Sequence, residues 1–205
     1  YIGDVGIGPN PNLAKRIDDA DVLLVLGARL GEMTTGGYAL LTPPKTKQNL
    51  IHVHSNPDEV GRVYAPDRGI CCDPIAFLRT AVDLVSKPIM ASPAQECAAY
   101  EAWQEPFATP GDVKMESVIS HLTTVMPSDT IITNGAGNYA AWLHRYYRYK
   151  SYRTQLAPTS GSMGYGLPAA VAAKLERPNQ EVVCLAGDGC FQMCMQEFGT
   201  AVQYG

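Results

Sequence analysis

An aspartate between two glycines ends an apolar run late in the chain. The run EVVCLA leads into Gly187, Asp188 and Gly189, and a helical pattern begins almost at once. Such a turn lies at the carboxyl edge of a strand, where open α/β sheets bind ligands. A carboxylate there repels a diphosphate unless a hard cation such as Mg²⁺ neutralises both. The pattern indicates Asp188 as the ligand of a metal-bridged diphosphate, with an N-capping aspartate as the simpler alternative.

A glycine-rich loop precedes a helix of small residues. The stretch SGSMGYGLPAAVAAKL holds Gly161, Gly164 and Gly166, and Pro168 is expected to start the helix. Glycines let a backbone approach a ligand closely. A purely structural loop is the alternative, but it leaves the long apolar Met163 among the glycines unexplained.

Two other patterns are weaker. GDVGIGPNP resembles a dinucleotide loop, but Pro11 stands where the third glycine is expected and no strand precedes it in the sequence. His52 and His54 in LIHVHS would share one face of a strand as a metal pair. Because no third ligand is in view, histidines of the core or its rim are the favoured interpretation.

Composition excludes several classes of protein. The 205 residues carry a net charge of −4 and only 18% charged residues, with no lysine or arginine run. We therefore expect no nucleic-acid or membrane partner, and a surface partly covered by other subunits or further chain. The six cysteines, including Cys190 and Cys194, are expected to be free thiols in a reducing cytoplasm. Both ends of the sequence look cut, so a longer parent protein is expected.

Alternating strand and helix patterns must position these groups. The aliphatic run 22–26 predicts a strand buried on both faces of a parallel sheet. NLIHVH and RGICC predict two further strands. Asp73 is expected to cap the helix that follows them. DTIITNG, RTQLAP and EVVCLAG predict three more strands, and one final helix carries an apolar stripe of Phe191, Met195, Phe198 and Val202. The sequence predicts an α/β fold with two doubly wound parallel-sheet domains, 1–87 and 113–205. The second domain is expected to be truncated at its C-terminus. A proline-containing linker, 88–112, joins the two domains and carries one short helix at 94–105.

Three segments of the second half resemble, in order and spacing, the diphosphate-binding domain of thiamine diphosphate enzymes, the acetolactate synthase group most of all. The segments are TNGAGNYAAW, SGSMGYGLPAAVAAKL and VVCLAGDGCFQMCMQEFGTAVQYG. DADVLLVLGARLGE and LIHVHSNPDEVGR look like the central domain of the same group. The resemblance covers essentially the whole chain. It implies thiamine diphosphate and Mg²⁺ as cofactors.

The resemblance also implies roles for single residues. Asp188 ligates Mg²⁺, and the backbone of Gly187, Gly189 and Cys190 lies against the diphosphate. A second metal ligand, an asparagine, is expected beyond residue 205.

The glycine loop wraps the aminopyrimidine ring of the cofactor in this family. Gly161, Ser162 and Met163 match its contacts: the Gly161 carbonyl accepts from the ring amino group, and Met163 is the wedge that bends the cofactor. Bending makes the cofactor its own general base.

Gly137, Asn138 and Tyr139 match a Gly-Gln-His run that contacts the diphosphate in acetolactate synthases. Tyrosine in place of histidine changes size and acid–base character. A decarboxylase or carboligase of the benzoylformate decarboxylase or benzaldehyde lyase type therefore stays open. Arg29 matches an arginine that contacts FAD in the central domain, but the residues after it differ, which leaves FAD open.

The implied activity is decarboxylation of a 2-keto acid such as pyruvate, with transfer of the remaining unit to a second carbonyl or a proton. In the family an activating glutamate comes from the neighbouring subunit. A homodimer or homotetramer is thus expected, and the isolated 205-residue chain is expected to be inactive. A non-catalytic FAD- or NAD-binding module is the alternative from another class.

Overall fold

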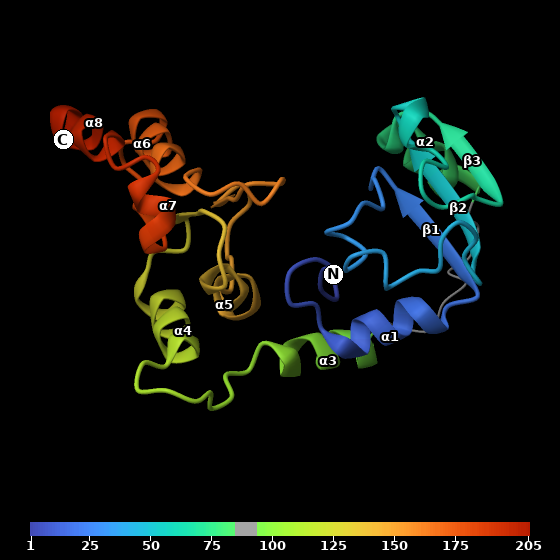
Figure 1. The fold of residues 1–205 in the computed structure, drawn as a ribbon, viewed down its shortest axis with the longest axis horizontal. Helices are drawn as coiled ribbons and strands as arrows, with labels where there is room; N and C mark the ends of the chain where they lie inside the picture. Colours follow the sequence, from blue (N-terminus) through green and yellow to red (C-terminus); the bar gives the residue numbers. More distant parts are fainter. Residues whose placement is uncertain (85–93) are drawn as a thin grey trace. The chain divides into compact units, whose positions relative to one another are not determined.

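The computed structural model describes residues 1–84 and 94–205 (Figure 1). It divides into two compact units, Tyr1–Trp103 and Gln104–Gly205. The predicted domain limit at residue 87 lies outside the described residues, so the limits 1–87, 88–112 and 113–205 stay a prediction. Within the described ranges, none of the helices is long and apolar enough to cross a bilayer.

The first unit is built on a parallel sheet. Its elements are α1 (Pro11–Asp19), β1 (Val22–Leu26), β2 (Asn49–His54), the 3-10 turn η1 (Pro57–Glu59), β3 (Arg68–Cys71), α2 (Pro74–Leu84) and α3 (Ala94–Trp103). In the described part, the strands pair in the order β1-β2-β3. Asp73 caps α2 as predicted, since its Oδ1 accepts from the backbone N–H of Ile75 at 2.9 Å and of Ala76 at 3.0 Å.

The prediction that the run 22–26, now β1, is buried on both faces is wrong. Leu50 and Val53 of β2 are fully buried, whereas Val22 and Leu24 of β1 are 55% and 47% exposed. Successive side chains of a strand point to opposite faces, and β1 is an edge of the described sheet. Its Val25 therefore enters the core while the alternate residues face outward.

The second unit holds a parallel sheet in which β4 is central. Its elements are α4 (Met115–Val125), β4 (Ile131–Asn134), α5 (Tyr139–Tyr146), β5 (Gln155–Leu156), α6 (Gly166–Glu176), β6 (Val182–Leu185), α7 (Asp188–Gln192) and α8 (Glu197–Tyr204). In residues 104–205 the strand order is β5-β4-β6, so the chain turns to one side of β4 and then crosses to the other. The α/β class with parallel sheets is confirmed. The order reverses in this sheet but not among the described strands of the first, where a doubly wound arrangement was expected.

Two helix boundaries differ from the sequence-based expectation. α6 begins at Gly166, and Pro168 lies within its first turn, where a missing N–H costs nothing. The predicted final helix is two helices, α7 and α8, because the chain turns at 193–196. The expected apolar stripe is exposed, at 39% for Phe191, 58% for Met195, 56% for Phe198 and 70% for Val202.

The amino end of α6 lies directly against the end of β4. The Thr133 hydroxyl donates to the Gly166 carbonyl at 2.8 Å. A Cβ on Gly166 would lie 2.8 Å from both the carbonyl carbon of Asn134 and the backbone nitrogen of Gly135. α6 also packs against β6 and α8 (Figure 1). This contact fixes the glycine loop beside the carboxyl end of the sheet.

A buried carboxylate holds the entry to α4 and makes stability depend on pH. Glu116 is 2% exposed, and its Oε2 accepts from the Thr109 hydroxyl at 2.8 Å. Hydrogen bonds from its own backbone amide and from the hydroxyl and amide of Thr109 lower the pKa of Glu116 below the ordinary 4.5. Burial raises this pKa, but by less than the hydrogen bonds lower it. A lowered folded-state pKa contributes stability above pH 4.5 that is lost as pH falls through the folded value.

We therefore expect Glu116→Gln to lower the urea midpoint at pH 7, and the difference from the wild type to shrink as the pH falls below 4.5. Glu176→Gln, at an exposed glutamate that ends α6, serves as the control and should follow the wild type throughout. Parallel midpoint curves for wild type and Glu116→Gln from pH 7 to 3 would show that Glu116 does not cause the dependence.

Candidate functional site

A crevice for a ligand is expected where the strand order reverses. β4 and β6 are neighbours and parallel, with Asn134 opposite Leu185, so both strands end at the same edge. The turn after β4, residues 135–139, ends at the first residue of α5 and leads on to β5, whereas the turn after β6, residues 186–190, includes the first three residues of α7. Open α/β sheets bind ligands between two such diverging turns. Seven of the predicted site residues lie on these two turns.

The two turns touch through a thiol and a phenol. The Cys190 thiol donates to the Ala136 carbonyl at 2.9 Å, and the Tyr139 hydroxyl donates to Cys190 Sγ at 3.5 Å. Burial raises the pKa of Tyr139 to about 12, and the bond to Cys190 acts in the same direction, so the phenol is neutral and serves as a donor. A Cβ on Gly135 would lie 2.8 Å from Cys190 Sγ, which explains a glycine there.

Asp188 is exposed and is the first residue of α7. The N-cap is Gly187, with no side-chain cap bond, so Asp188 is not the N-capping aspartate that the simpler alternative required. Within the described residues, its Oδ1 accepts only from the adjacent Gly189 N–H, at 2.8 Å. In the part of the chain that the structure describes, no three His, Cys, Asp or Glu side chains converge as a metal cage. One carboxylate fits Mg²⁺, which proteins bind through one or two carboxylates plus phosphate oxygens.

The glycine loop brings Met163 to the same turn. A Cβ on Gly189 would lie 2.9 Å from Met163 Cε, and Met163 itself is 45% exposed. Gly161 and Gly164 adopt φ of 69° and 80°, a region that other residues rarely enter. A Cβ on Gly161 would meet nothing within 4 Å, and Ser162 Oγ is 2.7 Å from Ser160 Oγ. The open side of this loop leaves room for a ring beside Met163.

Arg29 and the two histidines belong to the first unit. Arg29 Nε is 3.5 Å from Glu59 Oε2, and that carboxylate also binds Arg62 at 2.9 Å. His52 is buried, with Nε2 2.9 Å from the Ala28 carbonyl, and His54 packs edge-on against it at 6.2 Å between ring centroids. They are histidines of the core and its rim, as favoured.

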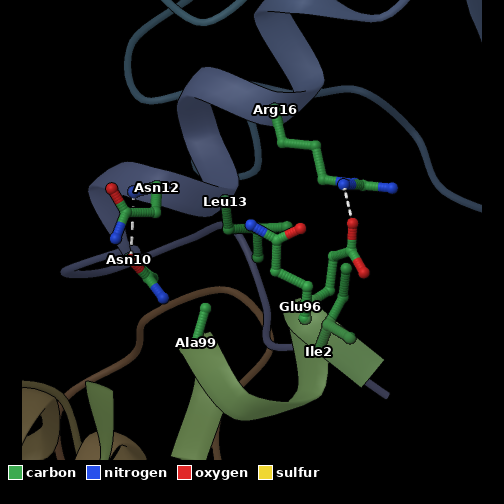
Figure 2. A pocket seen from close by; sticks show the side chains of 8 residues that line it. Ile2, Asn10, Asn12, Leu13, Arg16, Glu96 and Ala99 are labelled. Carbon is green, nitrogen blue, oxygen red and sulfur yellow. Dashed lines mark hydrogen bonds and ion pairs between the residues drawn. The ribbon is translucent and has the colours of Figure 1, made fainter. Parts of the chain in front are cut away.

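A cavity of about 300 Å³ in the first unit lies between α1 and α3 (Figure 2). Asn10, at the end of the predicted dinucleotide loop, caps α1 by accepting from the Asn12 N–H at 3.0 Å. Figure 2 shows the Arg16 guanidinium paired with the Glu96 carboxylate across the cavity. The pair neutralises the cation that a phosphate would need, so this cavity does not favour a dinucleotide.

Sequence reasoning missed three residues that build the crevice. Gly135 and Ala136 form its floor against Cys190, and Asn134 is 1% exposed with an Oδ1 that has no partner among the described residues. The glycine pair in TNGAGN directly after a strand was a usable signal for Gly135. No sequence pattern indicates the buried Asn134 oxygen.

Comparison with known proteins agrees with both halves of the chain. Residues 1–81 match the family model for the central domain of thiamine pyrophosphate enzymes. Residues 135–205 match the model for the C-terminal thiamine pyrophosphate-binding domain of the same enzymes, thiamine pyrophosphate being another name for thiamine diphosphate. The second match includes both turns of the crevice and the glycine loop.

Similar curated proteins are acetolactate synthases. The chain is 31% identical over 195 residues to the acetolactate synthase large subunit of Porphyra purpurea, covering 92% of this chain and 32% of that protein. It is 27% identical over 219 residues to the isozyme 3 large subunit of Escherichia coli (strain K12), covering 99% and 37%. The chain thus spans about a third of the length of these relatives. It belongs to the thiamine pyrophosphate enzyme family.

Proposed function

We propose that the second unit binds thiamine diphosphate with Mg²⁺ between the turns 135–139 and 186–190, as part of an acetolactate synthase-like enzyme that acts on a 2-keto acid such as pyruvate. One observation carries this proposal. An exposed carboxylate, Asp188, and a glycine loop bearing Met163 meet at the point where the strand order of the sheet reverses. A capping role for Asp188, or a purely structural role for the glycine loop, would not require Asp188 and Met163 to lie at the same place.

Different residues of the second unit would contact different parts of such a cofactor. Asp188 would bind the metal, and the backbone of Gly137, Asn138, Gly187, Gly189 and Cys190 would lie along the diphosphate. The half-exposed Met163, beside Gly161 and Ser162, would support the rings. When bound, the cofactor supplies the electron sink for decarboxylation, while the protein supplies metal and geometry.

Tyr139 keeps a decarboxylase or lyase of the same family as the second candidate. A tyrosine hydroxyl that is neutral at physiological pH, with a pKa near 12, cannot serve as the acid or base that a histidine would be. Incubating the full-length protein with pyruvate, thiamine diphosphate and Mg²⁺ separates the two. Acetolactate is the expected product, whereas acetaldehyde alone would select the decarboxylase.

Assembly and further cofactors extend this proposal. The curated relatives are named large subunits, a name that supports assembly with other subunits. We expect this assembly to be a homodimer or homotetramer. A neighbouring subunit would supply the activating glutamate, so residues 1–205 alone should not turn over pyruvate. FAD stays open, since the Arg29 side chain is 69% exposed and forms an ion pair only with Glu59 in the part of the chain that the structure describes. The six free thiols support a reducing compartment such as the cytoplasm.

A further inference from the structure

The Tyr139 ring fills the space between the two turns. Its Cε1 carbon would lie 2.7 Å from a Cβ on Gly137 and 3.2 Å from a Cβ on Gly187. One ring carbon is therefore enclosed by the backbones of both turns. Glycine is required at both positions, because any side chain would overlap the ring or press tightly on it.

The hydroxyl end of the same side chain reaches the floor of the crevice. Tyr139 Oη would lie 3.0 Å from a Cβ on Gly135 and donates to Cys190 Sγ at 3.5 Å. Cys190 is 2% exposed and is itself bonded to the Ala136 carbonyl. Tyr139 thus connects the turn after β4 to the turn after β6 along its whole length.

A diphosphate and this ring cannot occupy the crevice together. The proposed function places the diphosphate against the backbone of Gly137 and of Gly187, and a single aromatic ring already spans the distance between them. The hydrogen bond that holds the hydroxyl end of the ring is weak, since a thiol sulfur is a poor acceptor. Rotation of Tyr139 away from Cys190 would open the space without moving either strand.

We infer that Tyr139 is a latch whose ring must leave the crevice before a diphosphate can enter. The inference rests on the proposed function. It predicts that the closed ring lowers the apparent affinity for the cofactor by the fraction of time that the crevice is open. Removing the ring should therefore tighten binding, the reverse of what is expected for a residue that contacts the ligand.

Calorimetric titration of the full-length protein with thiamine diphosphate and Mg²⁺ tests this inference. Tyr139→Ala should bind about tenfold more tightly than wild type. Tyr139→Phe keeps the ring and should keep the lower affinity. Tyr152→Ala, at a tyrosine that is 88% exposed, is the matched control and should equal wild type. Equal or weaker binding by Tyr139→Ala would overturn the latch and leave the proposed function standing. No binding by any of these proteins would overturn both.

A second measurement covers the case in which Tyr139→Ala does not fold. 3-Fluorotyrosine placed at position 139 alone reports its surroundings by fluorine NMR. Adding thiamine diphosphate and Mg²⁺ should move the signal from a buried to a solvent-exposed environment. A signal that stays buried when the cofactor is bound would contradict the latch.

Discussion

Replacing Asp188 with asparagine in the full-length protein is expected to weaken thiamine diphosphate binding by about 10- to 100-fold in the presence of Mg²⁺. Asparagine keeps the size of the side chain but removes the charge that holds a hard cation. The fold should not suffer, because Asp188 is exposed and its carboxylate bonds only to the adjacent Gly189 N–H among the bonds found. Thermal unfolding without cofactor should therefore be unchanged.

Glu181→Gln is the matched control for this substitution. Glu181 is also exposed and also flanks β6, but at the opposite end of the strand from Asp188. Its removal should leave both the affinity and the Mg²⁺ dependence at wild-type values. An Asp188→Asn protein whose affinity still rises with Mg²⁺ as in wild type would place the metal elsewhere.

Gly166→Ala is expected to destabilise the protein by about 1–3 kcal/mol in chemical denaturation. The added Cβ would lie 2.8 Å from two backbone atoms, the carbonyl carbon of Asn134 and the nitrogen of Gly135. Backbone atoms of a buried strand end cannot swing aside as a flexible side chain can. α6 would have to move away from β4, and the Thr133 hydroxyl would lose its 2.8 Å bond to the Gly166 carbonyl.

The same substitution at Gly199 gives the control. Gly199 lies in α8, where a Cβ meets nothing within 4 Å. Alanine there should stabilise the helix by up to about 1 kcal/mol, since glycine is the poorer helix former. Equal effects of the two substitutions would mean that α6 is not held against β4 by this close approach.

Elements defined by local chemistry could be predicted from the sequence. The strand β1 begins and ends at the limits of its aliphatic run, Val22 to Leu26, and α2 begins where Asp73 caps it. The position of Asp188 after β6 also follows from a strand, a glycine and a helical pattern in succession. Each of these depends on neighbours in the chain.

Features that depend on tertiary contact could not be predicted. The helical period runs through residues 191–202, yet the chain turns between α7 and α8, because periodicity does not report where a helix breaks. The contact of Met163 with Gly189 and the packing of Tyr139 on Gly187 join residues far apart in sequence. The sequence indicates candidate residues for the site, but the meeting of the two turns and the ring between them depend on the strand order β5-β4-β6.

Calorimetric titration of the unmodified full-length protein tests the central proposal most directly, with thiamine diphosphate or thiamine as ligand and with Mg²⁺ or EDTA. The proposed site predicts that thiamine diphosphate binds with Mg²⁺ and loses most of its affinity in EDTA, while thiamine, which lacks the diphosphate, binds weakly in both. Binding of thiamine diphosphate that is equally tight in EDTA, or no tighter than that of thiamine, would contradict a metal-bridged diphosphate at Asp188.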